Sequence, residues 1–381
     1  MNVSPEVCSE IIRQFDAQGW HRTATEVDEA SGRWLLERLE AAGVQNREVP
    51  FPFTRLDLVE SCIRVRGEVI PAVPLIDSRL PESGTVIRGR FGDSDEPGTI
   101  AILGFGAHGM ASELEALRNS SHSAIVACIE GPEGGQSLLN AWHYDAPKGP
   151  PIVQVPGTAL PRLQDASRAG TEVEIHCGAT RTRTKANNIR ADVAGSESEL
   201  PPLIVLTPRS GWWHCAGERG GGLAIWLELV RLVKAARLRR DVIFLANTGH
   251  ELGFLGAHRY FESEPALAAR AKVTIHLGAN IGAAGAPLVV RSGEEALLGF
   301  ARRAEAFGRF GRQPEFAISQ NPAGEAGVVH KHGGKFISLI GPGFELFHST
   351  LDRWPQAIDP PSIAAAGDAV FEMLLALDRE P

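Results

Sequence analysis

The residues with the clearest chemical potential are a neighbouring histidine and glutamate, His250 and Glu251. They follow residues 242–247, an apolar run rich in β-branched side chains that predicts a buried strand. We expect a helix to begin at Glu251 and Leu252. Both side chains would then lie at the carboxyl end of the strand, where open α/β sheets place their ligands. A buried carboxylate there must be hydrogen-bonded, paired or metal-bound, because an isolated buried charge is too costly.

Two further segments carry residues of the same kind. Glu218 stands just before residues 222–237, whose apolar positions recur at helical spacing, and His348 is followed four residues later by Asp352. Carboxylate and imidazole groups bind divalent metals and transfer protons. Glu218 and Glu251 could instead be acids at the start of helices, stabilised by the helix dipole.

Several side chains near these positions have two interpretations each. His250 is either a general base, with an unperturbed pKa of about 6.5, or a satisfied polar residue. Arg209 either binds a substrate carboxylate through its planar guanidinium or pairs with Glu218. His276 is expected to be structural or to support the site from behind. Two aromatic residues are expected to line the pocket wall or to pack under the middle segment: Trp212 and Trp213.

The elements that position these residues alternate between strands and long helices. Helical spacing predicts helices over residues 222–237 and 362–377, with apolar strand-like runs before and between them. This alternation is typical of a mostly parallel sheet covered by helices on both faces. Short strand-like runs broken by Gly, Pro, Asp and Ser fill the middle of the chain. We predict an α/β domain of residues 1–56 and 186–381, interrupted by a β-rich inserted domain of residues 57–185.

Composition restricts the class of protein. The 381 residues carry a net charge of -8, which argues against a general nucleic-acid or membrane-surface binder. The five cysteines are scattered and never form a CxxC pair, so a reducing compartment is expected. The first residues lack the pattern of a signal peptide, and we find no apolar stretch long enough to span a bilayer. These features favour a cytoplasmic enzyme.

The order of the motifs resembles that of the zinc aminopeptidase family, which includes bacterial leucyl aminopeptidases and, more distantly, glutaminyl cyclases. The resemblance covers nearly the whole chain and implies the α/β fold of that family. The middle segment resembles the protease-associated domain that many of these enzymes carry. Four segments carry most of the likeness: AsnAsnIleArgAlaAspVal (187–193), GluArgGlyGlyGly (218–222), GluLeuGlyPheLeuGly (251–256) and PheHisSerThrLeuAsp (347–352).

The resemblance also implies roles for individual residues. In that family two metals are held by a His, a bridging Asp, a Glu, a second Asp and a final His, and a Glu before the ligand Glu is the general base. The ligand Glu falls on Glu251, the final His on His348 and the bridging carboxylate on Glu218. The general base falls on His250, and Asp352 also matches the family spacing.

Two family positions are lost outright. The first His is replaced by Arg209 and the second Asp by Gly278. The retained residues Glu218, Glu251 and His348 all belong to one of the two metal positions. They imply a single divalent metal, zinc, with an open fourth coordination position. Arg209 would lie close to Glu218, as a permanent cation where the second metal would have been.

These expectations favour a mononuclear metal-dependent hydrolase that cleaves an amide of a small amino-acid-like or peptide-like substrate. The metal would polarise the carbonyl and activate a water. His250 would accept the proton, and Arg209 would orient a carboxylate or stabilise negative charge. The alternatives are a catalytically silent binding protein without a metal, and a cyclase or acyl-transfer enzyme on the same site. The oligomeric state is left open, although the inserted domain could pair with another chain.

Overall fold

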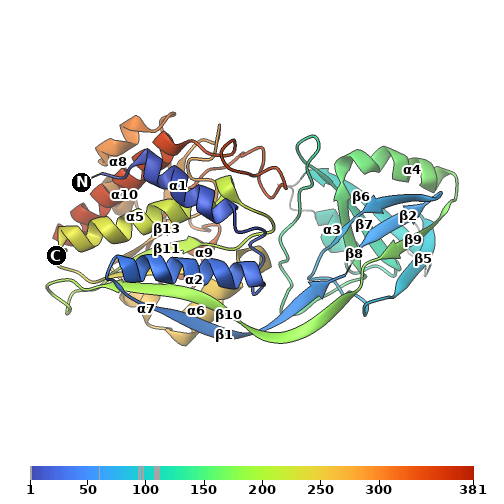
Figure 1. Ribbon diagram of the computed structural model, residues 1–381, viewed down its shortest axis with the longest axis horizontal. Coiled ribbons are helices and arrows are strands. Elements are labelled where there is room, and N and C mark those ends of the chain that lie inside the picture. The colour runs from blue at the N-terminus through green and yellow to red at the C-terminus, as the bar shows by residue number, and fades with distance from the viewer. Residues whose placement is uncertain (1, 60, 93–95, 97, 107–111) are drawn as a thin grey trace.

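The computed structural model describes residues 2–59, 61–92, 96, 98–106 and 112–381. These residues form two lobes that lie side by side (Figure 1), and both chain termini lie in the same lobe. Each lobe is built on its own eight-stranded sheet.

The larger lobe contains a mixed sheet whose centre is parallel. The predicted α/β class is therefore confirmed. Of the seven adjacent strand pairs, the four that join β12 to β11, β11 to β13, β13 to β16 and β14 to β15 are parallel. Strands β11 and β12 are buried along their whole length, as expected for strands covered on both faces. In spatial order the strands are β1 (Gln45–Leu58), β10 (Ala179–Val193), β12 (Val242–Asn247), β11 (Leu203–Pro208), β13 (Val273–Leu277), β16 (Phe336–Ile340), β14 (Val289–Ser292) and β15 (Glu315–Ile318).

Helices cover both faces of this sheet, as predicted. On one face a large apolar cluster joins helices α1 (Pro5–Asp16), α2 (Glu26–Ala41), α5 (Gly221–Ala236), α8 (Glu295–Arg302) and α10 (Pro360–Arg379). On the other face a smaller cluster involves α6 (Leu255–Ser263), α7 (Leu267–Arg270) and α9 (Glu325–Lys331). The predicted helices over 222–237 and 362–377 correspond to α5 and α10, displaced by at most two residues at any end.

The second lobe, which we call the insertion, is formed by the elements between Cys62 and His176. One face of its sheet packs against α4 (Leu160–Arg168), and α3 (Ser112–Leu117) lies beside β6. In spatial order its strands are β3 (Glu68–Pro71), β2 (Cys62–Val65), β9 (Glu172–His176), β5 (Val86–Phe91), β6 (Thr99–Gly106), β7 (Ala124–Glu130), β8 (Ile152–Pro156) and β4 (Val73–Pro74). Its resemblance to a protease-associated domain stays a prediction.

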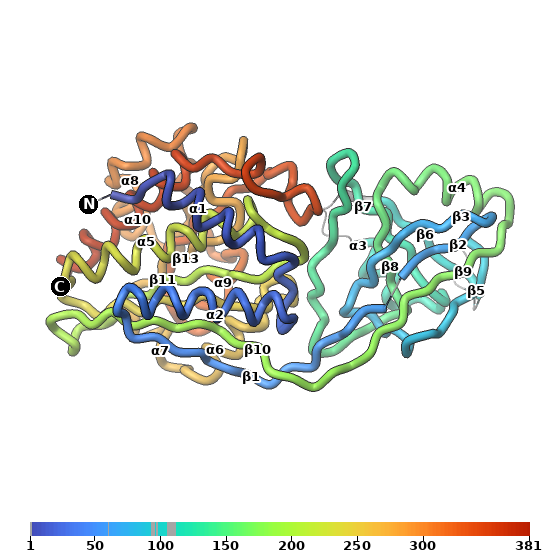
Figure 2. The backbone as a smooth tube through the Cα atoms, in the orientation of Figure 1, coloured from blue at the N-terminus to red at the C-terminus, as the bar shows by residue number. Residues whose placement is uncertain are grey.

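Two connections fix the insertion to the larger lobe. Strands β1 and β10 pair antiparallel over fourteen residue pairs, from Gln45 with Asp192 to Leu58 with Ala179. Figure 2 shows the two strands side by side, running from one lobe to the other. An apolar cluster also spans the two lobes, with Leu75 and Leu138 of the insertion in the same cluster as Trp212. The insertion is therefore packed against the larger lobe rather than tethered by a loop.

Helix α10 corrects one expectation from the sequence. Of the described helices it is the one that is long and apolar enough to cross a membrane, whereas the sequence was expected to hold no such stretch. However, 72% of its most apolar window is buried inside the protein. That burial is typical of a core helix, and α10 packs against α5 and α1.

The start of α5 depends on a close approach of two backbone segments. A Cβ atom added at Gly221 would lie 1.9 Å from the carbonyl oxygen of Ile281. Gly221→Ala should therefore destabilise the larger lobe by roughly 1–3 kcal/mol, because the backbone must move. Gly308→Ala is the matched control, because nothing lies within 4 Å of its added Cβ. Urea denaturation of both variants tests this, and equal midpoints would show that the contact is unimportant.

Candidate active site

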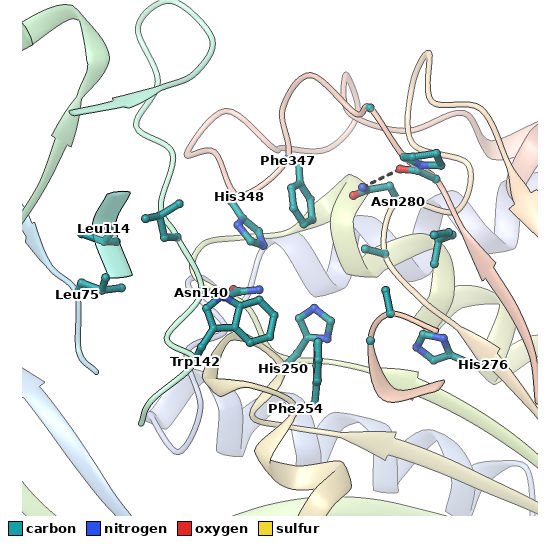
Figure 3. A pocket seen from close by; sticks show the side chains of 18 of the residues that line it. Leu75, Leu114, Asn140, Trp142, His250, Phe254, His276, Asn280, Phe347 and His348 are labelled. Carbon is teal, nitrogen blue, oxygen red and sulfur yellow. Dashed lines mark hydrogen bonds between the residues drawn. The ribbon is translucent and has the colours of Figure 1, made fainter. Parts of the chain in front are cut away.

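A cavity of about 810 Å³ lies where the two lobes meet. The larger lobe contributes residues that follow the carboxyl ends of parallel strands, including His250 after β12 and Asn280 after β13. This is the edge at which open α/β sheets bind their ligands. Figure 3 shows the imidazole rings of His250 and His348 pointing into the cavity from different segments, with Trp142 of the insertion nearby.

The turn that carries His250 differs from the predicted helix start. Residues His250–Leu252 form a single 3₁₀ turn, and α6 begins only at Leu255. Gly249 and Gly253 on either side have φ values of 82° and 71°, a left-handed conformation that a regular helix cannot continue through. The interruption gives His250 and Glu251 different surroundings instead of placing both on one helix.

His250 is held by Glu325, a residue to which none of the sequence motifs pointed. Its Nδ1 lies 2.7 Å from Oε1 of Glu325, the first residue of α9. The other oxygen of Glu325 lies 3.1 Å from Nε2 of His276, whose Nδ1 lies 2.9 Å from the hydroxyl of Ser338. One carboxylate therefore orients two imidazole rings.

Burial and charge act in opposite directions on this pair. Burial opposes ionisation of Glu325, but the charge and hydrogen bonds of His250 and His276 hold the pKa of the carboxyl well below its usual range. Burial, followed by the nearby guanidinium of Arg219, lowers the pKa of His250. The arrangement favours an ionised carboxylate beside a neutral imidazole, which is the state a general base requires.

A second cluster joins Glu218, Arg219 and His348. Oε1 of Glu218 lies 2.5 Å from Nη2 of Arg219 and 3.3 Å from Nε2 of His348. Burial opposes ionisation, but Arg219 and then His348 lower the pKa of Glu218 to about 2. The predicted proximity of Glu218 and His348 is thus present, with an arginine as the third member.

The backbone around this cluster is tightly held. The carboxylate of Asp352 accepts hydrogen bonds from the amides of Gly217 (2.5 Å) and Glu218 (2.9 Å), although burial raises its pKa to about 8. His348 has a φ of 58°, unusual for a residue with a side chain. Its carbonyl oxygen accepts a hydrogen bond of 2.8 Å from Nε1 of Trp213. Asp352 and Trp213 therefore position the cluster from outside the cavity, and Trp213 does not form the cavity wall.

The backbone of the insertion contacts the residues of the site directly. The amide of Leu138 donates to the carbonyl of His348, and Nδ1 of His348 lies 2.9 Å from the carbonyl of Leu138. The amide of Ala141 donates to the carbonyl of Glu251. Trp212 is fully buried in the apolar cluster between the lobes, so it packs rather than lining the cavity.

Glu251 does not join the other two predicted metal ligands. One carboxylate oxygen accepts hydrogen bonds from the amide (2.8 Å) and hydroxyl (2.6 Å) of Thr23, and the other from the hydroxyl of Ser210 (2.6 Å). Both oxygens are thus occupied by segments that lie behind the site. This corrects the predicted ligand set of Glu218, Glu251 and His348.

Arg209 also lies elsewhere than predicted. Its Nη1 lies 2.6 Å from the carboxylate of Asp28 in α2, and its Nη2 donates to the carbonyl of Asn187. The role expected for Arg209, a cation beside Glu218, belongs to Arg219. The one signal in the sequence that pointed to Arg219 is its position directly after Glu218.

These contacts show that the described residues do not fit the metal that the family resemblance implies. No group of three or more His, Cys, Asp or Glu side chains within the described ranges is placed to hold a metal ion. Both oxygens of Glu251 already accept hydrogen bonds, and Glu218 has a guanidinium as its counter-charge, which leaves Oε2 of Glu218 and Nε2 of His348 as two buried atoms without a hydrogen-bond partner in the described part of the chain. At Gly278, an added Cβ would lie 2.9 Å from the ring of His276. A side chain that restored the lost ligand there would displace this ring.

Comparison with known proteins identifies the larger lobe. Residues 209–374 match the model of peptidase family M28. We call this matched segment the M28 domain. The match begins at Arg209, after the insertion.

Solved structures resemble the M28 domain and the insertion together. A peptidase M28 precursor from Shewanella amazonensis matches with a TM-score of 0.80 and 14% identity, over 98% of this chain and 93% of that one. BSAP, a zinc aminopeptidase from Bacillus subtilis, matches with a TM-score of 0.78 and 18% identity, over 98% and 94% of the two chains. The predicted zinc aminopeptidase-like fold is therefore confirmed.

A curated relative is similar over a short segment only. The vacuolar membrane protease of Candida glabrata is 33% identical over 81 residues, which cover 20% of this chain. The matched segment spans 8% of the length of that relative. The likeness therefore concerns a short segment and not the whole of that larger protein.

The ion pair between Arg209 and Asp28 gives a test of the corrected role of Arg209. Both side chains are almost completely buried, so Arg209→Met leaves an uncompensated carboxylate and should cost about 3–5 kcal/mol of stability. The double variant with Asp28→Asn should recover part of that loss. Thermal unfolding measures both. Arg13→Met, which breaks an exposed pair with Glu10, is the control and should leave the melting temperature unchanged.

Proposed function

We propose that this chain is an amide hydrolase in which His250, rather than a metal, activates the attacking water. The M28 domain supports a peptidase-like hydrolase. The observation that carries the proposal is the hydrogen bond of 2.7 Å between His250 and Glu325 at the edge of the cavity. No step of the proposal uses zinc, because the described residues do not fit it.

The hydrogen bond to Glu325 sets the tautomer of His250. An ionised carboxylate can only accept, so Nδ1 carries the proton and Nε2 keeps its lone pair. Burial lowers the pKa of the ring, which keeps this lone pair available near neutral pH. Nε2 can then take a proton from a water as its oxygen attacks the carbonyl carbon. The same proton passes to the leaving nitrogen when the carbon–nitrogen bond breaks.

The second cluster contributes His348 to the cavity. His348 lines the cavity: its Nδ1 is held by the carbonyl of Leu138, whereas Nε2 lies 3.3 Å from Oε1 of Glu218 and has no hydrogen-bond partner among the described residues. With the Nδ1 proton donated to Leu138, Nε2 offers a lone pair, and we assign it the role of accepting the N–H of the scissile amide and so orienting that group. Arg219 acts through Glu218, because the guanidinium does not line the cavity.

A catalytically silent binding protein is the second candidate. It is favoured by the capture of Glu251, a family ligand position, by Thr23 and Ser210. Such a protein would bind amide-containing ligands in the same cavity without cleaving them. A cyclase or acyl-transfer enzyme remains the third alternative, and it would leave no oxygen from solvent water in the product.

Substitution of the pair separates these functions. On a panel of acyl and aminoacyl p-nitroanilides and esters, His250→Gln and Glu325→Gln should each lower kcat by about 10²- to 10⁴-fold, the usual contribution of a general base. His258→Gln, a histidine in α6 outside the cavity, is the control and should keep full activity. Dialysis against 1,10-phenanthroline should leave the rates of the native protein and of the His258→Gln control unchanged.

Two results would reject the hydrolase as proposed. The first is a stoichiometric metal whose removal abolishes activity, since His250 would then not act alone. The second is binding without turnover across the whole panel, which would establish the silent binding protein instead.

The pH dependence of the reaction offers a separate test of His250. A general base works when deprotonated, and the pKa of His250 is lowered from 6.5 by burial and then by Arg219. The acidic limb of kcat/KM should therefore lie below pH 6.5. Arg219→Gln removes the nearby cation and should move the limb towards higher pH. A limb at or above 6.5 in the native protein would contradict the assignment.

A further inference from the structure

The charged side chains that line the cavity already have partners. At the insertion side, Glu115 lies 3.1 Å from Arg118 and 2.7 Å from Lys148. Arg118 is buried and lies 2.7 Å from the carboxylate of Asp77. At the side of the M28 domain, His250 and His276 are hydrogen-bonded to Glu325, and Nε2 of His348 lies 3.3 Å from Glu218 without a hydrogen-bond partner among the described residues. Among the described lining residues, no carboxylate or guanidinium is left over for a ligand.

This balance disfavours a charged ligand. An ammonium or carboxylate group that enters the cavity loses its hydration and finds no counter-charge that is not already engaged. The free energy cost of such a transfer exceeds that of a neutral polar group several-fold. Binding of a ligand with a free amino group or a free carboxylate is therefore unfavourable.

The wall of the cavity is apolar and partly aromatic. Leu75, Leu114 and Leu139 of the insertion line it. Trp142 is 49% exposed and contacts Phe254 edge to face, at 5.4 Å between ring centroids. Phe254 in turn contacts the ring of His250 at 4.9 Å. A row of rings thus leads from the accessible Trp142 to the proposed base (Figure 3), and a bulky apolar group bound along it would remove these surfaces from water.

Two amide oxygens in the cavity call for hydrogen-bond donors. Oδ1 of Asn280 and Oδ1 of Asn140 are buried and have no partner among the described residues. The orientation of Asn280, which is 5% exposed, is set by its NH₂ group, because this donates to the carbonyl of Gly341 at 2.9 Å. An unpaired buried acceptor is costly unless a ligand N–H reaches it.

We propose that the cavity takes an electrically neutral amide that is blocked at its amino end: an N-acylated amino-acid amide with an aromatic or large aliphatic side chain. The side chain packs on Trp142 and Phe254, and the ligand N–H groups donate to Asn140 and Asn280. The proposal deepens the proposed function and rests on the same site. The volume of about 810 Å³ is within the range of small-molecule sites.

Binding to a variant that cannot turn over tests the ligand class. We would use the His250→Gln protein and titrate N-acetylphenylalaninamide, phenylalaninamide and N-acetylphenylalanine calorimetrically. The first is neutral, the second a cation and the third an anion near pH 7. The neutral compound should bind at least roughly tenfold more tightly than either charged one, because only it avoids an unpaired charge.

Matched tryptophan variants test the location of the site. In the same background, Trp142→Ala should weaken binding of the neutral compound roughly fivefold or more, since it removes an aromatic contact. Trp20→Ala is the control: Trp20 is 54% exposed, also contacts another ring edge to face, and does not line the cavity. It should bind as the parent does.

Three outcomes would overturn the proposal. They are equal or tighter binding of a charged compound, no binding of the neutral one, and equal effects of the two tryptophan substitutions. Because binding is measured without turnover, failure of the hydrolase proposal leaves this result intact. Conversely, a hydrolase that prefers substrates with a free amino group would refute only the ligand class.

Discussion

The carboxylate of Glu325, shared by two imidazole rings, is the interaction on which the rest of the site depends. A buried ionised carboxylate needs strong partners, and His250 and His276 supply one for each oxygen. His276 can reach it because Gly278 and Gly324 leave room for its ring: an added Cβ would lie 2.9 Å or 3.0 Å from Cε1. The proposed base, its partner and the lost metal-ligand position therefore lie together in one packed unit.

Glu218 and Glu251 are likewise stabilised by partners within the protein. Glu218 has the guanidinium of Arg219 as a counter-charge, bound 2.5 Å away, where the family resemblance implied a metal. Glu251 is satisfied by neutral donors from Thr23 and Ser210, and burial raises its pKa. Each of these carboxylates thus has a partner among the described residues, although Oε2 of Glu218 has none of its own. At the positions where the sequence motifs differ from the family pattern, side chains of the protein itself contact the carboxylates.

The sequence predicted features that depend on short-range patterns. Helical and strand periodicity predicted the α/β class and the helices α5 and α10, and the altered motif singled out His250 as a proton acceptor. Contacts between distant segments could not be read from it. Glu325 follows His250 by 75 residues and reaches it only because α9 packs over the sheet. Arg209 was misassigned because its partner Asp28 lies 181 residues away, in a helix whose acids look like ordinary surface residues.

The insertion takes part in the site rather than covering it from a distance. Its backbone bonds to His348 through Leu138 and to the carbonyl of Glu251 through Ala141, so the floor of the cavity includes both lobes. Separating the lobes would break these bonds and distort the placement of His348, whose left-handed backbone already depends on its surroundings. Ligand entry by wide opening of the lobes is therefore costly. Trp142, which is 49% exposed, is by contrast accessible without separation of the lobes.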